Sequence, residues 1–204
     1  MSSVVAVTGA NGFVGRSLCQ HLRTTGASVR ALTRSAQAPE LAWAVGDLGP
    51  GTQWGSSLQG VDCVIHCAAR VHVVQDTDAH PLQSYRRVNV DGSRSLAMAA
   101  AEAGVRRLVF LSSLKVHGEQ TEPGRPYTED MAPAPEDAYG QSKWEAEQVL
   151  REVSHQTGLE LVVVRPPLVY GPGVKANFLQ LMKVVARGTP LPLGAVDNRR
   201  SFLA

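Results

Sequence analysis

The sequence has little excess charge of either sign and few aromatic residues. It contains 20 Lys and Arg against 18 Asp and Glu, a net charge of +2, and only 5% of its residues are aromatic. The basic residues are scattered along the chain, whereas nucleic-acid-binding surfaces concentrate positive charge on one face or helix. The composition therefore argues against such a surface, and we expect no nucleic-acid partner.

Long hydrophobic runs are also missing from the sequence. No apolar segment approaches the roughly 20 residues that a transmembrane helix needs. No signal-peptide pattern precedes the first apolar run, at residues 4–7. We therefore expect a cytoplasmic protein that has no membrane partner.

Cysteine is scarce as well. The three cysteines, Cys19, Cys63 and Cys67, are odd in number and lack the spacing of a disulfide framework. Cys63, His66 and Cys67 are close in sequence, but the predicted strand at 61–66 points alternate side chains to opposite faces. We therefore expect neither a disulfide scaffold nor a metal site.

A glycine-rich stretch, TGANGFVG at 8–15, directly follows the apolar run at 4–7. A buried strand that ends in a glycine turn and continues as a helix presents backbone N–H groups and a positive dipole end to a pyrophosphate. In such a turn, Gly9 permits the tight bend, Gly12 lets the phosphates approach, and Gly15 lets the helix lie close to the sheet. The glycines could instead form only a flexible loop, but the flanking strand and helix favour a dinucleotide site.

Glycines also end four helical patterns, each just before an apolar run that is typical of a strand. Such glycines adopt the left-handed conformation that follows a helix. The four glycines are Gly26, Gly60, Gly104 and Gly158. The predicted helices lie at 12–25, 52–59, 82–103 and 137–157, with one more at 175–187. Near-continuously apolar strands between helices predict a doubly wound parallel sheet, the Rossmann α/β fold.

The chain length suits one domain and the beginning of another. We expect a dinucleotide-binding domain over residues 1–170 and the start of a small substrate domain over 171–204. The only long irregular segment, at 114–136, contains four prolines and follows a predicted strand. Because ligands bind at the carboxyl ends of such strands, we expect this segment to be a loop on the substrate side.

Tyr139 and Lys143 are four residues apart in the predicted helix at 137–157. This spacing places both side chains on one helical face. A nearby ammonium and a cationic nicotinamide would lower the pKa of the phenol, so Tyr139 is a candidate proton relay. Taken alone, the pair could belong to a solvated helix face, and Ser112 and Ser113 could simply end a strand.

The order of several motifs adds a resemblance. The chain is similar to the extended short-chain dehydrogenases/reductases, specifically the nucleotide-sugar epimerase/dehydratase family and its UDP-glucose 4-epimerase group. The motifs are TGANGFVG (8–15), GDL (46–48), HCAA (66–69), VNVDGS (88–93), LSSLKVHG (111–118), YGQSK (139–143), RPPLVYGPG (165–173) and RRSF (199–202). The resemblance implies NAD(P)-dependent hydride transfer at a hexose carbon, C4, of a UDP- or dTDP-sugar.

The resemblance also implies roles for individual residues. Tyr139 would be the acid/base, Lys143 would bind the nicotinamide ribose and lower the tyrosine pKa, and Ser113 would bind the sugar oxygen, with Ser112 as the alternative. For the substrate, the resemblance implies contacts from Ser113, Asn177 and Arg200, the last on the nucleotide diphosphate. The residues expected to bind the cofactor are Gly9, Asn11, Gly12, Phe13, Val14, Gly15, Thr33, Arg34, Asp47, Leu48, Ala68, Ala69, Asn89, Tyr139 and Lys143.

Within that set, Asp47 and Leu48 resemble the pair beside the adenine. Ala68 and Ala69 resemble the small residues over which the cofactor passes, and Asn89 resembles the helix asparagine that supports the active-site backbone. Each of three residues has an alternative to a role in binding. Asp47 could form a turn, Asn89 could be a solvated helix residue, and Arg200 could be a surface charge.

Three departures from the family pattern refine these expectations. The second predicted strand ends in Thr33-Arg34, and no acid occurs between Gly15 and Glu40, so NADP is favoured over NAD with Arg34 as the phosphate partner. Leu114-Lys115 replace the Asp-Glu pair of 4,6-dehydratases, so dehydration is not expected. The relatives also run on for roughly another hundred residues, as a complete substrate domain would require.

Two further functions stay open at this point. One is an NADPH-dependent 4-keto nucleotide-sugar reductase, which the Thr33-Arg34 pattern favours. The other is a regulatory protein that binds NADP without turnover, against which the set of Ser113, Tyr139 and Lys143 argues. By resemblance, a homodimer through the helices at 82–103 and 137–157 is expected, although the apolar residues there could equally be core packing.

Overall fold

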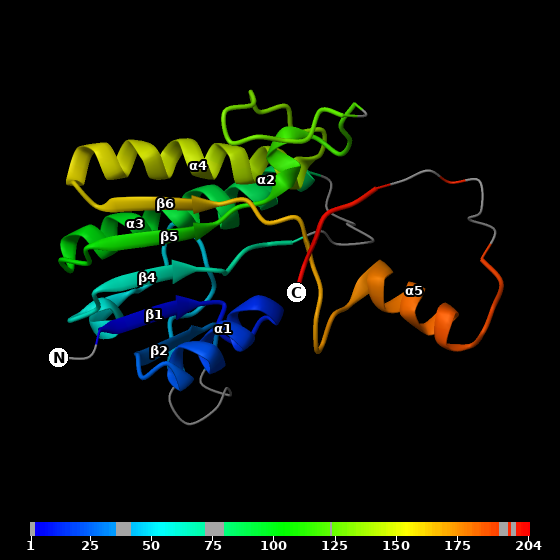
Figure 1. Ribbon diagram of the computed structural model, residues 1–204. Helices are drawn as coiled ribbons and strands as arrows, with labels where there is room; N and C mark the ends of the chain where they lie inside the picture. The colour runs from blue at the N-terminus through cyan, green and yellow to red at the C-terminus, as the bar shows by residue number, and fades with distance from the viewer. Residues whose placement is uncertain (1–2, 36–41, 72–79, 123, 192–195, 197–198) are drawn as a thin grey trace. The chain divides into compact units, whose positions relative to one another are not determined.

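The computed structural model describes residues 3–35, 42–71, 80–122, 124–191, 196 and 199–204 (Figure 1). The chain divides into two compact units, Met1–Arg165 and Pro166–Ala204. The first unit contains the glycine turn and the predicted catalytic residues. The assignment of the two units to cofactor and substrate binding stays a prediction.

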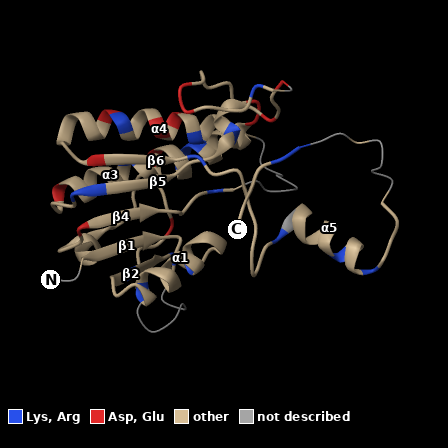
Figure 2. Ribbon diagram, viewed as in Figure 1, with Lys and Arg blue, Asp and Glu red and all other residues tan. Residues whose placement is uncertain are grey.

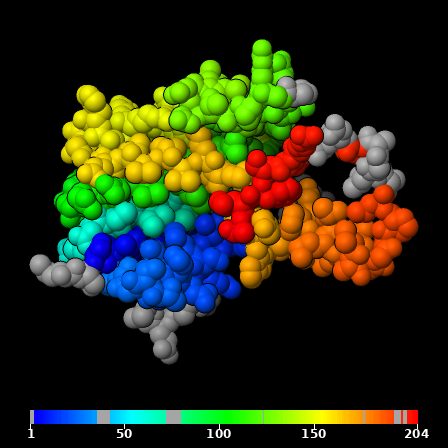
Figure 3. Space-filling view, in the orientation of Figure 1, coloured from blue at the N-terminus to red at the C-terminus, as the bar shows by residue number. Residues whose placement is uncertain are grey.

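The first unit is built on a six-stranded parallel sheet with the order β3-β2-β1-β4-β5-β6. This is the strand order of the doubly wound dinucleotide-binding fold. The space-filling view shows the same succession, from blue β1 and α1 to yellow α4 (Figure 3). The predicted Rossmann α/β fold is therefore confirmed. The strands are β1 (Val4–Thr8), β2 (Ser28–Thr33), β3 (Ala42–Ala44), β4 (Cys63–His66), β5 (Arg107–Leu111) and β6 (Glu160–Val164).

Helices connect these parallel strands. The observed helices are α1 (Phe13–Thr24), α2 (Pro81–Tyr85), the π-helix η2 (Arg86–Asp91), α3 (Gly92–Glu102) and α4 (Ala138–Thr157), together with the 3-10 turns η1 (Gly55–Leu58) and η3 (Leu114–His117). Helix α4 agrees with its prediction because Asp137 caps its start through the Gly140 N–H, at 2.6 Å, and Gly158 ends it with φ +77°.

Apolar side chains cover both faces of the sheet. On β1, Ala6 belongs to one buried cluster, with α3 and α4 residues such as Leu96 and Leu150. Its neighbours Val5 and Val7 belong to a second cluster, which includes Cys19 of α1. Because alternate strand residues point to opposite faces, every central strand must be apolar on both sides, as the sequence indicated.

One local prediction was wrong. The helix expected at 52–59 is only the short turn η1, because Gly55 and Gly60 both have positive φ (+44° and +66°) and leave room for a single turn. The helix expected at 82–103 is confirmed, and its middle part is the π-helix η2 between α2 and α3. Strand β3 was missed because three residues carry too little periodicity to detect.

The second unit contains α5 (Ala176–Ala186), which confirms the helix expected at 175–187, and a parallel pair, β7 (Leu168–Val169) with β8 (Phe202–Leu203). Tyr170, Phe178 and Phe202 form an aromatic cluster with ring centroids 5.5–6.3 Å apart. This pairing of distant segments was not predicted from the sequence, because a two-residue strand has no detectable pattern.

Charged residues of both signs are distributed over the elements. Figure 2 shows basic and acidic positions alternating along α4, whereas α1 and α5 carry basic positions alone. Within the described part of the chain, no helix is long and apolar enough to cross a membrane.

Candidate active site

The glycine turn lies between the carboxyl end of β1 and the first turn of α1. Gly9 has φ +64°, and a Cβ there would lie 2.9 Å from the Ala68 backbone. A Cβ at Gly15 would collide with the Gly9 carbonyl. Glycine is therefore required at both positions, because the turn packs against the end of β4 and the helix packs against the turn.

The start of α1 is suited to a diphosphate. Its first N–H groups have no intrahelical acceptor, Gly12 supplies no capping side chain, and the first turn contains no acidic residue. Gly12 is exposed, and the Gly12 N–H bonds back to the Gly9 carbonyl at 2.8 Å. The residues present therefore fit a dinucleotide pyrophosphate, with no side chain filling the cradle.

Two of the predicted cofactor residues meet at the ends of β2 and β3. Arg34 Nε lies 3.0 Å from Asp47 Oδ1, and both side chains are largely exposed. Leu48, next to Asp47, lies over Gly92, where a Cβ would be 2.7 Å from Leu48 Cγ. The structure thus brings Arg34 and Asp47 together, although they are 13 residues apart in the sequence.

Asn89 fixes the loop after β4 to the start of α4. The Asn89 side chain accepts from the Arg70 N–H at 2.8 Å and donates to the Arg70 carbonyl at 3.0 Å. It also donates to Ser142 Oγ at 2.9 Å, and Ser142 in turn donates to the Tyr139 carbonyl at 2.8 Å. Asn89 is buried, so the alternative of a solvated residue is wrong. Ala68 and Ala69 lie in the loop that Asn89 holds.

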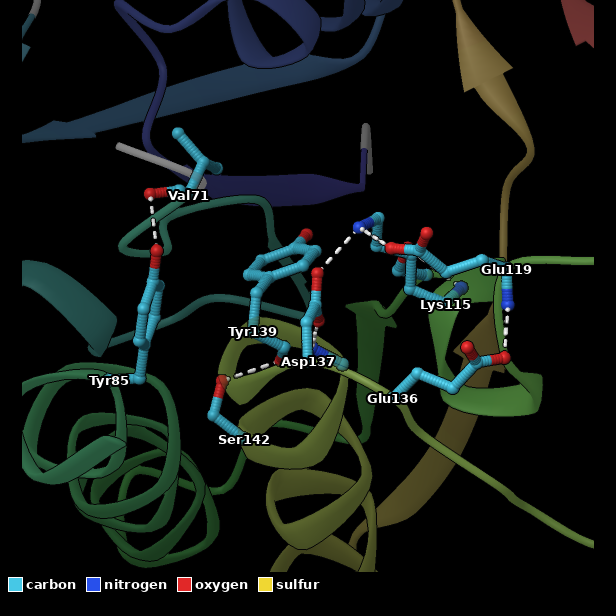
Figure 4. A network of polar contacts seen from close by, with 10 residues as sticks. Val71, Tyr85, Lys115, Glu119, Glu136, Asp137, Tyr139 and Ser142 are labelled. Atoms are coloured by element: carbon cyan, nitrogen blue, oxygen red, sulfur yellow. Dashed lines mark hydrogen bonds and ion pairs between the residues drawn. The ribbon is translucent and has the colours of Figure 1, made fainter. Parts of the chain in front are cut away.

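Tyr139 projects from the first turn of α4 beside Ser113, which follows β5. Ser113 lies close enough to the phenol for its side chain to lower the pKa of Tyr139, and Ser113 Oγ accepts from the Lys115 N–H at 3.2 Å. Figure 4 shows the Tyr139 ring between Tyr85, whose ring is 6.2 Å away and edge-on, and the ion pair of Lys115 and Asp137. Lys115 Nζ is 2.5 Å from Asp137 Oδ2. The structure therefore brings Ser113 and Tyr139 close together, and their roles toward a substrate stay predictions.

The pKa of Tyr139 is raised, chiefly by burial, while the hydrogen bond from Ser113 acts in the opposite direction. The charge of Asp137 raises it further, and the charge of Lys115 lowers it. This corrects the sequence-based expectation that the protein lowers the phenol pKa through Lys143. The burial of the phenol outweighs the effect of nearby cations.

Lys143 lies one helical turn after Tyr139 in α4, and its predicted role beside the nicotinamide ribose stays a prediction. Its side chain is buried, with Nζ 4.0 Å from the centre of the Phe110 ring. Burial lowers the pKa of Lys143 to about 7, although the charges of Glu147 and Cys67 act in the opposite direction. The spacing of Tyr139 and Lys143 in the sequence therefore did not predict that the Lys143 amine lies against Phe110.

The burial of Lys143 predicts a pH dependence of stability. Between pH 7 and 9 the folded amine is largely neutral, whereas the unfolded amine, with its ordinary pKa near 10.4, still binds a proton. The free energy of unfolding should therefore rise with pH, by up to about 1.4 kcal/mol per unit. Denaturant titrations at several pH values should show this slope in the parent and not in Lys143→Met.

The rise of the free energy of unfolding with pH should end near pH 9, because the titration of a buried thiol has the opposite effect. Burial raises the pKa of Cys67 to about 11. Above pH 9 the unfolded thiol loses its proton while the folded thiol keeps it, which offsets the contribution of Lys143, so stability levels off until the unfolded lysine titrates near pH 10.4. An undiminished slope between pH 7 and 9 in Lys143→Met would contradict the assignment to Lys143.

Ser112 belongs to a different network from Ser113. Ser112 Oγ donates to Glu147 Oε1 at 2.5 Å, and the fully buried Glu147 carboxylate also accepts two hydrogen bonds from Arg165, at 2.9 and 2.6 Å. Arg151 donates to the same carboxylate at 2.9 Å. Adjacent residues leaving a strand point in opposite directions, so Ser113 lies beside Tyr139 and Ser112 lies in this structural cluster.

Burial acts to raise the pKa of Glu147, but hydrogen bonds from Arg165 and Ser112 outweigh it and hold that pKa below its ordinary value. No sequence motif indicated a role for Glu147. Arg165 was quoted only as the first residue of RPPLVYGPG, and a long-range ion pair leaves no local pattern by which to find it.

The two remaining predicted substrate residues belong to the second unit. Asn177 lies in the first turn of α5 and Arg200 lies just before β8, and both are exposed. Phe13 and Val14 begin α1, and Asn11 is exposed in the turn that precedes them. The roles of these residues stay predictions.

Fold and site together define a Rossmann-fold protein of the short-chain dehydrogenase type. Residues 5–204 match the model of the NAD dependent epimerase/dehydratase family, and the chain belongs to that family. It is 42% identical to a UDP-glucose 4-epimerase of Vibrio cholerae over all of this chain and 63% of the relative.

Two further relatives agree with this family assignment. An N-acetyl-alpha-D-glucosaminyl-diphospho-ditrans,octacis-undecaprenol 4-epimerase of Escherichia coli O157:H7 is 32% identical over 99% of this chain and 60% of that protein. The solved structure of MoeE5 in complex with UDP-glucose and NAD is 32% identical, with a TM-score of 0.75 over 93% of this chain and 63% of that chain. The chain thus spans about three fifths of the length of these relatives.

Proposed function

We propose that this protein is an NAD(P)-dependent nucleotide-sugar epimerase that acts at C4 of the hexose of a UDP- or dTDP-sugar. The observation that carries the proposal is the placement of Ser113 beside Tyr139, close enough to act on the pKa of the phenol, in a Rossmann unit whose glycine turn fits a diphosphate. The relatives named above, two 4-epimerases and a protein bound to UDP-glucose and NAD, support it.

In this mechanism the chain's residues orient the sugar and move one proton. Ser113 hydrogen-bonds the oxygen on the reacting carbon. Tyr139 Oη, as the phenolate that a cationic nicotinamide beside it would favour, takes the hydroxyl proton and later returns it. The nicotinamide, when bound, accepts and returns the hydride. Asn89 and Ser142 hold the Tyr139 backbone in place, so the protein contributes orientation and placement of charge.

Incubation of the protein with UDP-glucose and NAD tests the proposal directly. We expect UDP-galactose to appear until the two sugars reach equilibrium, as followed by proton NMR of the anomeric signals. Tight binding of dinucleotide without turnover of any UDP- or dTDP-hexose would instead support the regulatory alternative and overturn the enzymatic proposal.

The reductase alternative and the preference for NADP both depend on Arg34. A planar guanidinium at the end of β2 suits a 2′-phosphate, but its ion pair with Asp47 places a carboxylate beside it. The relative MoeE5 was solved in complex with UDP-glucose and NAD. We propose that NADP is accepted and that Arg34 is its phosphate partner. Consumption of NADPH with a 4-keto nucleotide sugar would favour the reductase.

Replacement of Arg34 should therefore change the choice of cofactor. Because a hydrogen bond to a charged group contributes about 1.5–3 kcal/mol, we expect Arg34→Ala to weaken NADP binding about 10- to 100-fold and to leave NAD binding within about twofold. Isothermal titration calorimetry measures both. Arg94→Ala removes another exposed, ion-paired arginine and serves as the control. An equal loss for the two dinucleotides would contradict the role of Arg34.

The homodimer through residues 82–103 and 137–157 is part of the same proposal. Within one chain, Arg86 of η2 pairs with Glu145 of α4 at 2.6 Å, and Arg94 of α3 pairs with Glu152 at 3.1 Å. These pairs hold the helices side by side, so that together they present one surface to a second copy. Sedimentation velocity tests this assembly.

A further inference from the structure

A buried histidine with no role in the proposed mechanism lies beneath the site. His66 is the last residue of β4 and is fully buried, with its ring 5.7 Å from the Phe110 ring. Both ring nitrogens have partners: Nδ1 lies 2.6 Å from Thr8 Oγ1, and Nε2 lies 3.0 Å from Ser93 Oγ. Thr8 ends β1 and Ser93 lies in α3, so the ring joins three elements.

The partners of the two hydroxyl groups determine the direction of these hydrogen bonds. Ser93 Oγ lies 2.6 Å from the Asn89 carbonyl, which can only accept, so the single hydroxyl proton of Ser93 is used there. His66 Nε2 must therefore donate to Ser93. In a neutral ring Nδ1 is then an acceptor and receives the proton of Thr8, whose oxygen accepts from the Ala68 N–H at 3.1 Å.

We propose that His66 is a positioning residue, fixed as the neutral Nε2–H tautomer, that couples the dinucleotide turn to the catalytic helix. The effect of His66 on catalysis rests on the proposed function, in which the turn binds the dinucleotide and Tyr139 is the acid/base. The order of donation is Ala68 N–H to Thr8, Thr8 to His66, His66 to Ser93, and Ser93 to the Asn89 carbonyl. In this series of hydrogen bonds, every donor and acceptor has a partner only when the protons are donated in this order.

The two ends of this chain lie at the two parts of the site. The Ala68 backbone is the surface against which Gly9 packs, 2.9 Å from where a Cβ of Gly9 would lie. Asn89 lies in the π-helix η2, and its side chain reaches Ser142 and, through it, the Tyr139 carbonyl. A displacement of His66 therefore disturbs both the diphosphate turn and the backbone that carries Tyr139.

The surroundings keep the ring neutral. Burial is the main cause that lowers the pKa of His66, and the charge of Lys143 lowers it further, to about 3. Lys143 lies against Phe110, which also contacts the His66 ring. The ring therefore carries no charge at the pH at which the site would work, and it acts through hydrogen bonds alone.

Thr8 offers a matched pair of variants with which to test this role. Thr8→Val keeps the shape of the side chain and removes the hydroxyl, whereas Thr8→Ser keeps the hydroxyl and removes a methyl group. Because loss of the donor leaves a buried acceptor unsatisfied, we expect Thr8→Val to bind dinucleotide about tenfold more weakly. Thr8→Ser should bind within about twofold of the parent, even though it creates the larger packing defect.

Two measurements without ligand make the test independent of the proposed function. Nitrogen-15 NMR of histidine-labelled protein should show His66, assigned through His66→Gln, as an Nε2–H ring that does not titrate between pH 5 and 8. Amide hydrogen exchange should become faster at Ala68 and at residues 138–142 together in Thr8→Val, and not in Thr8→Ser.

An Nδ1–H tautomer, a titrating ring, or exchange that accelerates at Ala68 alone would overturn the role of His66. If the parent binds no dinucleotide, the proposed function fails, and the tautomer and the exchange pattern still decide the role of His66.

Discussion

Replacement of Tyr139 by Phe should lower the rate of epimerisation by about 10²–10⁴-fold, the usual contribution of a positioned acid or base. The variant keeps the ring that lies edge-on to Tyr85 and removes only the hydroxyl that lies beside Ser113. Stability and dinucleotide affinity should therefore stay close to those of the parent. Initial rates with UDP-glucose, together with calorimetry, measure both.

The matched control is Tyr85→Phe. The Tyr85 hydroxyl donates to the Val71 carbonyl at 3.3 Å and lies beside the same phenol (Figure 4). Its removal takes away a neighbouring hydroxyl without taking away the proposed acid/base, so we expect a change in rate of less than about tenfold. Equal rates in Tyr139→Phe and the parent would refute the assignment of Tyr139.

The largest loss of stability should follow replacement of Glu147 by Gln. This change keeps the side-chain volume and removes the charge that neutralises Arg165, whose side chain is only 17% exposed. Breaking a buried ion pair by removing one partner costs about 3–5 kcal/mol, and we expect a loss in that range. Denaturant unfolding should show a lower midpoint with an unchanged dependence on denaturant concentration.

Arg151 provides the comparison for Glu147. It donates to the same carboxylate, but its side chain is 43% exposed, so solvent screens the interaction. Arg151→Met should therefore cost less than about 1 kcal/mol. Since the pKa of Glu147 is lowered in the folded state, the contribution of this cluster is present above the ordinary carboxyl pKa and is lost as the pH falls below it. A similar cost for Glu147→Gln and Arg151→Met would contradict this ranking.

Interactions between residues close together in the sequence determined much of the fold of this protein. The glycine-rich turn, the four glycines that follow predicted helices, and the apolar runs each depend on the conformation and solvation of a few neighbouring residues. All four of those glycines, at 26, 60, 104 and 158, have φ between +66° and +85°. The order of the motifs also indicated the family to which the chain belongs.

Contacts between distant residues had to come from the tertiary structure. Sequence spacing placed Lys143 on the same helical face as Tyr139, but only the folded chain showed that its amine is buried against Phe110 of β5. The sequence did not distinguish the two adjacent serines. In the folded chain Ser112 donates to Glu147, whereas Ser113 lies beside Tyr139.

The sequence by itself thus determined the five longer strands of the parallel sheet, most of the helices, the glycine turn and the family. The tertiary structure decided which serine meets the phenol, the burial of Lys143, the pairing of Arg34 with Asp47, and the chain of donors through His66. The physical reason is the range of the forces involved. Backbone conformation and apolar periodicity act over a few residues, whereas partners and burial are set by strand order and register, which bring together residues far apart in the sequence.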